Sequence, residues 1–539
     1  MQDGASNVGA DAVVSALEVC GVERVFGIPG THNLEIYRSL SRSSIRHVVF
    51  RHEQGAGYAA DGHSRASGRP GVVLTTTGPG LMNATTALAT AYADSVPVLA
   101  LSPGVPIGLE GADVGFLHEP KDQQGCMDRL VERSVRVRDA DEAADAICET
   151  FARWSSGRPR PVHIEIPLDV LEGVWGAAAQ PAARTLAPPS PGPEQLARAL
   201  EAMSTASRPL IVAGGGCRAA SGALRELAER WDAAVVTTVN GKGALSERHE
   251  LSAGAHLRLA SVRRALDDAD CLLVVGSELA DSDLWGGTLC PGGPVVRIDI
   301  DDAQLRKNLP ERCEVISLHG DARAVMEALS ARLAATAGVR RSVADGASQA
   351  AEIRDLALAE ATEQDGLWRA INDAVRAELP RTAIVAGDSA QVSYYGTAHF
   401  WPADEPGQFL YPTGYATLGY GLPAAIGAKL AAPERPVVVL VGDGGFMFTA
   451  SELLTAAELG LSLPIVVANN RGFGEIRDQM RERGIPPIGV DLLPPDFALL
   501  AQACGGSGRR VSDVNRLGAA VSEALTVPGP TVIELEVGS

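Results

Sequence analysis

The sequence predicts an α/β protein built from three doubly wound parallel-sheet domains. Short runs of β-branched residues alternate with Ala-rich helical stretches along the whole chain. This alternation is typical of parallel sheets with helices on both faces. A chain of 539 residues, of which 46% are hydrophobic and 21% charged, can bury several hydrophobic cores.

Two stretches without a periodic apolar pattern suggest where the domains meet. Residues 175–195 contain five prolines, and residues 336–349 also lack an apolar period. We therefore expect domains at residues 1–175, 190–335 and 350–539. No short repeat is visible, although the first and third domains could be diverged structural relatives.

Composition excludes several classes of partner. A formal net charge of −19, with no cluster of Lys and Arg, opposes binding to nucleic acid or to anionic membrane surfaces. The first residues lack a basic segment and read as a helix followed by a strand, and no apolar run approaches the length of a membrane span. Eight well-separated cysteines without a Cys-x-x-Cys pair predict free thiols. A soluble, cytoplasmic protein is expected.

The third domain contains a motif suited to a diphosphate. A buried strand at residues 437–441 runs directly into Gly442-Asp443-Gly444-Gly445, and a helix is expected from Phe446 through Leu454. Glycines allow the backbone to approach an anion, and a helix N-terminus directs free N–H groups toward it. The Asp443 carboxylate can hold a bridging divalent cation.

A second motif follows at a fixed distance. The strand at residues 463–468 ends in Asn469-Asn470-Arg471-Gly472. Because neighbouring parallel strands end side by side, Asn470 and the Gly472 carbonyl are expected to join Asp443 around Mg²⁺. Each motif alone is more often a simple turn. The pair at this spacing is the thiamine-diphosphate motif.

Glu53 is the predicted catalytic carboxylate. It follows the strand at residues 45–50 and begins an Ala-rich helix, where an isolated Glu would merely complement the helix dipole. Thiamine chemistry requires a carbanion at the thiazolium carbon, and the cofactor's own aminopyrimidine acts as the base. A carboxylate bound to the pyrimidine ring nitrogen favours the tautomer that removes the proton, and we assign this role to Glu53.

The chain resembles the acetolactate synthase/pyruvate oxidase/pyruvate decarboxylase family. The resemblance implies a pyrimidine-binding domain, a central domain and a diphosphate-binding domain, in that order. It also implies a cofactor held between the first domain of one subunit and the third domain of another, in a homodimer or homotetramer. Besides the metal motif, the matching stretches are residues 25–30 (VFGIPG), 51–53 (RHE), 77–83 (TGPGLMN), 94–97 (DSVP) and 418–428 (LGYGLPAAIGA).

The resemblance assigns further residues to the cofactor by position. Leu418 matches the large apolar residue that supports the bent cofactor, and Ser389 and Gln391 match the loop that touches the diphosphate. The remaining implied cofactor contacts are Pro29, Gly30, Gly78 and Asn83 in the first domain and Gly442, Gly444 and Gly445 in the third. A tight Gly-Pro-Gly turn is the alternative explanation for Gly78.

Two departures from the family pattern indicate the reaction. Acetolactate synthases carry an Arg that meets FAD and the second oxo acid, whereas this chain has Glu278, and a family Trp is replaced by Gln479. Both changes argue against FAD and favour decarboxylation of a small 2-oxo acid to an aldehyde. An acetolactate synthase-like carboligase is the alternative. A non-catalytic paralogue would be expected to lack Glu53, Asp443 or Asn470, and all three are present.

Residues 116–123 replace the loop where the synthases carry Phe-Gln-Glu. Residues 472–477, followed by 488–491 and 495–497, resemble 5-guanidino-2-oxopentanoate decarboxylases, and so do residues 413–420. A guanidinium side chain requires a carboxylate, and Glu475, Glu119 and Asp122 are the candidates. Glu475 could instead lie at a helix start, and Asp122 could face water. His118 is the candidate for supplying a proton, since a neutral imidazole can do so near pH 7.

Overall fold

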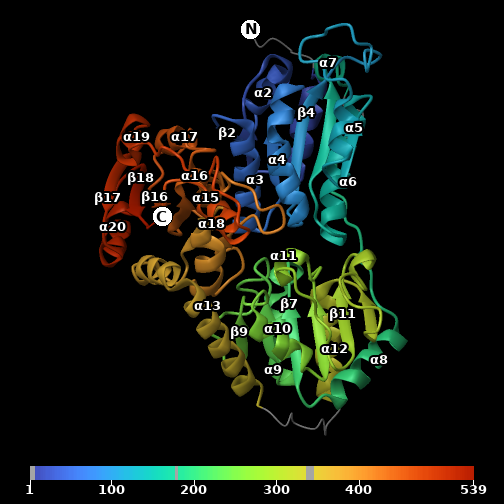
Figure 1. Cartoon of the computed structure of the whole chain (residues 1–539). Helices are drawn as coiled ribbons and strands as arrows, with labels where there is room; N and C mark the ends of the chain where they lie inside the picture. Colours follow the sequence, from blue (N-terminus) through green and yellow to red (C-terminus); the bar gives the residue numbers. More distant parts are fainter. Residues whose placement is uncertain (1–6, 177–179, 336–344, 539) are drawn as a thin grey trace.

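The computed structural model describes residues 7–176, 180–335 and 345–538. Across these ranges the chain forms three six-stranded sheets in which every pairing between neighbouring strands is parallel (Figure 1). Helices flank each sheet, which confirms the predicted α/β class. The three sheets lie within the three domains expected from the sequence, and the first and third stand side by side above the central one in Figure 1.

The first sheet has the strand order β2-β1-β3-β4-β6-β5. Its strands are β1 (Arg24–Gly27), β2 (Arg46–Val49), β3 (Gly71–Leu74), β4 (Val98–Gly104), β5 (Arg133–Arg136) and β6 (Val162–Pro167). Its helices are α1 (Gly9–Val19), α2 (Leu34–Leu40), α3 (Glu53–Ser67), α4 (Pro79–Ala93), α5 (Gln123–Asp128), α6 (Ala140–Ser156) and α7 (Leu168–Glu172). The chain thus starts with the expected helix and strand.

The central sheet has the strand order β12-β11-β10-β7-β8-β9. The direction in which successive strands are added across the sheet reverses between β10 and β7. Such a reversal opens a crevice at the carboxyl ends of the strands. The strands are β7 (Pro209–Ala213), β8 (Ala234–Thr237), β9 (Ser252–Gly254), β10 (Cys271–Val275), β11 (Val295–Asp299) and β12 (Val315–His319). The helices are α8 (Pro193–Thr205), α9 (Ser221–Trp231), α10 (Ala260–Asp267), α11 (Asp281–Leu284) and α12 (Ala322–Ala335).

The third sheet, β14-β13-β15-β16-β18-β17, repeats the strand arrangement of the first. The strands are β13 (Ile384–Gly387), β14 (Phe409–Leu410), β15 (Val437–Gly442), β16 (Leu463–Asn469), β17 (Ser507–Val511) and β18 (Pro530–Glu536). The helices are α13 (Gly346–Ala377), α14 (Ala398–Phe400), α15 (Gly421–Ala431), α16 (Asp443–Phe446), α17 (Glu452–Glu458), α18 (Gly474–Glu482), α19 (Phe497–Ala503) and α20 (Leu517–Ala524). The terminal domains therefore share a topology, although their sequences show no repeat.

Helices α3 and α15 join the first and third domains. A side chain on Gly62 would meet the backbone oxygen of Ala424 at 2.2 Å, and one on Gly427 would meet that of Ala59 at 2.0 Å. The two helices cross backbone to backbone, which only glycine permits at these positions. Consequently one hydrophobic core runs through both domains.

Some local predictions need correction. The helix expected from Phe446 through Leu454 is split, because α16 ends at Phe446 and α17 begins only at Glu452. Of the second expected linker, residues 336–344 lie outside the described residues. The rest begins α13, where the Asp345 side chain accepts a hydrogen bond from the Ala347 N–H and so caps the helix.

Two predictions about the whole chain, on its cysteines and on membrane spans, can be compared with the described residues. All eight cysteines are free thiols there. Among the described helices, none is long and apolar enough to span a bilayer.

Candidate active site

The register of two strands places the predicted metal ligands together. Gly442, the last residue of β15, pairs with Ala468 near the end of β16, so Asp443 and Asn470, which follow the two strands, leave the sheet at the same edge. The Asn470 backbone N–H donates to Asp443 Oδ1 at 3.3 Å. The Asp443 side chain is buried, and burial raises the pKa of its carboxyl.

The Asn470 side chain completes a set of oxygen ligands that fits Mg²⁺. One terminal atom of its amide lies 3.1 Å from Asp443 Oδ1 and 2.9 Å from the Gly472 carbonyl oxygen. As a nitrogen, this atom donates to both oxygens. As an oxygen, it would stand from each of them at about the distance that separates neighbouring Mg²⁺ ligands, since ligands about 2.1 Å from the ion lie roughly 3 Å apart. The structure therefore brings the three expected ligands together, as a Mg²⁺ site would require.

The loop that follows is held in one conformation. Gly472 has φ 152°, and a side chain there would meet the Val490 oxygen at 1.9 Å. Gly472 also bridges to Asp491, and Arg477 donates to the Asn470 carbonyl at 3.1 Å. This packing fixes the direction of the Gly472 carbonyl.

The glycine turn leaves its backbone open to the neighbouring cavity. A side chain on Gly444 would meet the Phe473 ring at 2.8 Å, and one on Gly445 would meet Asp388 Oδ2 at 2.6 Å. Gly442 through Gly445 line the cavity together with Ser389 and Gln391. An anion such as a diphosphate fits this turn, because no side chain blocks the backbone.

Asp388 supports the loop that presents Leu418, a role that was not predicted from the sequence. Its carboxylate accepts the backbone N–H groups of Gly419 at 2.9 Å and Gly421 at 2.5 Å. Burial raises the pKa of Asp388 to about 6, although these hydrogen bonds oppose the shift. An acid directly after the buried strand β13 was the available signal. Leu418 itself lines the cavity, as the resemblance implied.

The first domain carries the other half of the site. Glu53 is the first residue of α3, and His52 caps the helix by accepting the Gln54 N–H at 3.2 Å. Glu53 is 9% exposed, and Asn83 Nδ2 donates to its carboxylate at 3.0 Å. The structure therefore brings Glu53 and Asn83 together.

Other predicted residues surround this carboxylate. A side chain on Gly80 would lie 3.1 Å from Glu53 Oε1 and 2.9 Å from Thr76. Thr76 also packs against Gly30, the residue after Pro29, at 2.8 Å from the position of a Gly30 Cβ atom. The 29–30 loop thus lies beside Glu53.

A loop containing His118 covers Gly78. Gly78 has φ 63° and precedes α4, and its N–H donates to Gln123 at 2.8 Å. A side chain on Gly78 would meet the His118 carbonyl oxygen at 2.3 Å. The His118 ring packs on His32 with centroids 5.0 Å apart, and within the described residues its buried Nδ1 has no hydrogen-bond partner. His118 therefore belongs to the first half-site.

The two other acids proposed for substrate contact have local partners. Glu119 accepts the backbone N–H groups of Asp113 and Phe116 at 3.0 and 2.9 Å, which braces its own loop. Asp122 caps α5 by accepting the Gly125 N–H at 2.8 Å. Neither lines the cavity that contains the metal motif.

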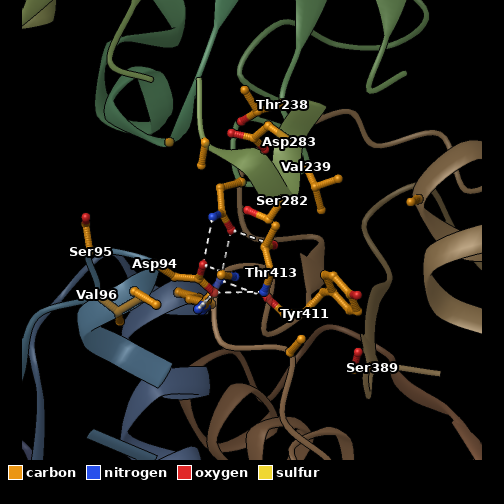
Figure 2. Close-up of a pocket in the computed structure, with 18 of the residues that line it drawn as sticks. Asp94, Ser95, Val96, Thr238, Val239, Ser282, Asp283, Ser389, Tyr411 and Thr413 are labelled. Atoms are coloured by element: carbon orange, nitrogen blue, oxygen red, sulfur yellow. Dashed lines mark hydrogen bonds and ion pairs between the residues drawn. The ribbon is translucent and has the colours of Figure 1, made fainter. Parts of the chain in front are cut away.

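A cavity of about 1870 Å³ opens where the three domains meet. Figure 2 shows Asp94 of the first domain facing Thr413 of the third, with Asp283 of the central domain above them. Asp94 accepts hydrogen bonds from Arg65, Asn240 and the Thr413 N–H at 2.8, 3.1 and 3.0 Å. One carboxylate therefore ties all three domains together.

The cavity contains only one of the two half-sites. Its lining includes Leu418, the glycine turn, Asn470, Gly472 and Glu475. Glu53 and His118 are not among its lining residues. In the described part of one chain, the predicted pyrimidine and diphosphate contacts therefore do not line the same cavity.

The substrate candidate Glu475 lies in α18 on the cavity wall. Its Oε1 accepts from Tyr395 Oη at 3.2 Å and from Gln479 Nε2 at 2.9 Å, and its Oε2 accepts from Gln391 Nε2 at 3.1 Å. All three donors are neutral. In the described part of the chain, no ion pair neutralises this carboxylate.

The central domain contributes an unexpected cation. Arg258 lines the cavity and was not identified from the sequence, because nothing local marks a loop Arg as part of a site. Glu278, which stands where the synthases carry Arg, is tied instead to Arg158 and to Lys307 Nζ, the latter at 2.9 Å.

Three family models match the chain. The family model described as "Thiamine pyrophosphate enzyme, N-terminal TPP binding domain" matches residues 7–126, and the central and C-terminal TPP binding domain models of the same family match residues 196–329 and 388–535. Thiamine pyrophosphate is another name for thiamine diphosphate.

Relatives that align with nearly the whole chain indicate the same family. The chain is 43% identical to the "Probable 2-ketoarginine decarboxylase" of Pseudomonas aeruginosa, over 99% of this chain and 95% of that one. It is 33% identical to the acetolactate synthase isozyme 1 large subunit of Escherichia coli, over 98% and 94% of the two chains. A "Probable acetolactate synthase large subunit" of Methanocaldococcus jannaschii is 32% identical over 98% and 91%. Together with the three domain matches, these relatives show that the chain belongs to the thiamine pyrophosphate enzyme family.

Proposed function

We propose that the protein is a thiamine-diphosphate- and magnesium-dependent decarboxylase that converts 5-guanidino-2-oxopentanoate to an aldehyde and CO₂. The observation that carries the substrate assignment is Glu475, a carboxylate on the cavity wall that is held by neutral donors only. A cationic side chain would pair with it. The relative named as a 2-ketoarginine decarboxylase supports the same assignment, because 2-ketoarginine is this oxo acid.

Residues of the third domain would bind the metal ion and the cofactor. Asp443, Asn470 and the Gly472 carbonyl would hold Mg²⁺, and the turn from Gly442 to Gly445 would receive the diphosphate. Leu418 would support the bent cofactor. When bound, the cofactor supplies a nucleophilic carbon and an electron sink for the decarboxylation.

Two further residues would handle protons. Glu53 would hold the pyrimidine ring nitrogen, with Asn83 fixing the orientation of the carboxylate. His118 would supply the proton that the aldehyde carbon gains after CO₂ leaves. Both act from the first domain.

We further infer a homodimer or homotetramer with active sites between subunits. The inference rests on the separation of the two half-sites within one chain, since a second copy would have to supply the missing half. The eight free cysteines support a reducing compartment such as the cytoplasm.

A carboligase of the acetolactate synthase type is the second candidate. Arg258 favours it, because a cation in the cavity could hold the carboxylate of an acceptor oxo acid. The two reactions are separated by their products. Incubation with thiamine diphosphate, Mg²⁺ and a panel of guanidino, aromatic, branched and unbranched 2-oxo acids should yield CO₂ and the matching aldehyde. Acetolactate formed from pyruvate would favour the carboligase.

Glu475→Gln tests the substrate assignment. The variant should raise KM for 5-guanidino-2-oxopentanoate by on the order of 100-fold, and far less for 7-methyl-2-oxooctanoate, which has the same shape without the charge. Asp478→Asn is the control, because Asp478 lies on the same helix, 3.4 Å from the same Gln391 amide. Equal losses on both substrates would assign Glu475 to the fold.

A further inference from the structure

Tyr395 contacts two charged groups of the cavity wall, Glu475 and Arg258. Its hydroxyl donates to Glu475 at 3.2 Å, and the guanidinium carbon of Arg258 lies 5.2 Å from its ring centroid. Arg258 also lies 4.9 Å from the ring centroid of Trp285. The guanidinium therefore packs on two aromatic faces, an arrangement that cation–π attraction favours.

The two charged groups contact the same tyrosine but do not pair with each other. Within the described residues, neither Arg258 nor Glu475 has an opposite charge within 4.0 Å. Burial lowers the pKa of Arg258 to about 10, which reflects the loss of water around the cation. A desolvated guanidinium that can reach a carboxylate would ordinarily form a bidentate pair with it.

We propose that Tyr395 is a positioning residue that keeps Arg258 apart from Glu475, and that this separation leaves Glu475 open to the cationic end of the substrate. The inference rests on the proposed function for the substrate class. If Arg258 reached Glu475, the internal guanidinium would occupy the place of the substrate's guanidinium. The Tyr395 and Trp285 rings, on which Arg258 packs, thus set specificity without touching the reacting atoms.

The test measures binding of two unreactive probes to the holoenzyme by calorimetry. The first is 5-guanidinopentanoate, and the second is 7-methyloctanoate, its uncharged isostere. Wild type should bind the guanidino probe at least about tenfold more tightly. Tyr395→Leu should bring the ratio of the two Kd values close to one, because Arg258 is then free to pair with Glu475.

Removing the competing cation should reverse this loss. In the double variant Tyr395→Leu/Arg258→Leu, the Kd ratio should return to within about threefold of wild type, and Arg258→Leu alone should retain it. Tyr395→Phe keeps the ring and should also retain most of the ratio. A purely structural role for Tyr395 predicts no rescue by the second substitution.

The outcomes separate this inference from the proposed function. Equal binding of the two probes by wild type would overturn both. Discrimination by wild type without rescue in the double variant would overturn the inference alone. A loss in Tyr395→Phe as large as that in Tyr395→Leu would do the same, since the hydroxyl rather than the ring would then be responsible.

Discussion

The carboxylate of Glu452 accepts a hydrogen bond from the backbone N–H of His52 at 3.1 Å, across 400 positions of the chain. It also accepts the Arg51 N–H at 3.2 Å and the Thr455 hydroxyl at 2.6 Å. Glu452 is fully buried and belongs to α17, just after the metal motif. The third domain thus holds the segment from which Glu53 projects.

Replacing Glu452 should therefore destabilise the protein. Glu452→Ala leaves buried N–H groups without an acceptor and should lower the free energy of unfolding by on the order of 3 kcal/mol, measured by urea denaturation. Glu458→Ala is the control, because Glu458 lies on the same helix as Glu452 and forms an exposed ion pair with Arg51. That change should cost less than about 1 kcal/mol. Similar losses in the two variants would contradict the assigned role.

Glu53→Gln should abolish most turnover while leaving the fold intact. The amide keeps the size of the side chain and its contact with Asn83, but it lacks the charge that the pyrimidine ring requires. We expect kcat to fall by on the order of 1000-fold, with cofactor affinity changed much less. Steady-state kinetics and calorimetric titration with thiamine diphosphate measure the two quantities. Turnover near that of wild type would remove Glu53 from the mechanism.

Asp443→Ala removes the only charged protein ligand proposed for Mg²⁺. The affinities for Mg²⁺ and for thiamine diphosphate should fall together, each by on the order of 100-fold, in calorimetric titrations. Asp491→Ala is the matched control, since Asp491 lies beside Gly472 but pairs with Arg477 at 2.9 Å. Cofactor binding to the Asp443 variant at wild-type strength in the presence of a chelator would disprove the metal site.

Asp283 should make stability depend on pH. Burial, followed by the nearby charge of Asp94, raises the pKa of Asp283 to about 7. Because the folded pKa exceeds the unfolded value near 4, the stability that this group contributes is complete below pH 4 and is lost as the pH rises through 7. The stability of Asp283→Asn relative to wild type should therefore rise by on the order of 4 kcal/mol between pH 4 and pH 8.

Urea denaturation across this pH range measures the effect. Asp281→Asn, an exposed neighbour on the same helix, should follow the pH dependence of wild type. The role assigned to Asp283 is wrong if its Asn variant and wild type differ by the same amount at both ends of the range.

Local signals explain what the sequence could predict. The meeting of Asp443 and Asn470 could be predicted because both directly follow buried strands, and parallel strands align their ends. The position of Glu53 at a helix start could be predicted because it follows a strand and begins an Ala-rich helical stretch. These elements are fixed by residues close to them in the chain.

The remaining features depend on contacts between distant segments. Arg258 and Tyr395 meet across two domains, and Glu452 reaches His52 from the far end of the chain. No periodicity or motif encodes such a pair, because each residue is unremarkable among its own neighbours. The break between α16 and α17 was likewise not predicted, because residues 446–454 have a helical pattern and tertiary packing overrode that local propensity.

The backbone crossing of α3 and α15 has a consequence for how the molecule melts. Core residues of the first sheet, such as Phe26 and Val73, belong to the same continuous cluster as Ile384 and Val439 of the third. The two ends of the chain should therefore lose their structure in one cooperative transition. The central sheet has its own apolar cluster on one face only, because the cluster on its other face includes α13 and Phe400. A heating calorimeter would accordingly record the first and third sheets, the pair that is most distant in sequence, melting as one unit.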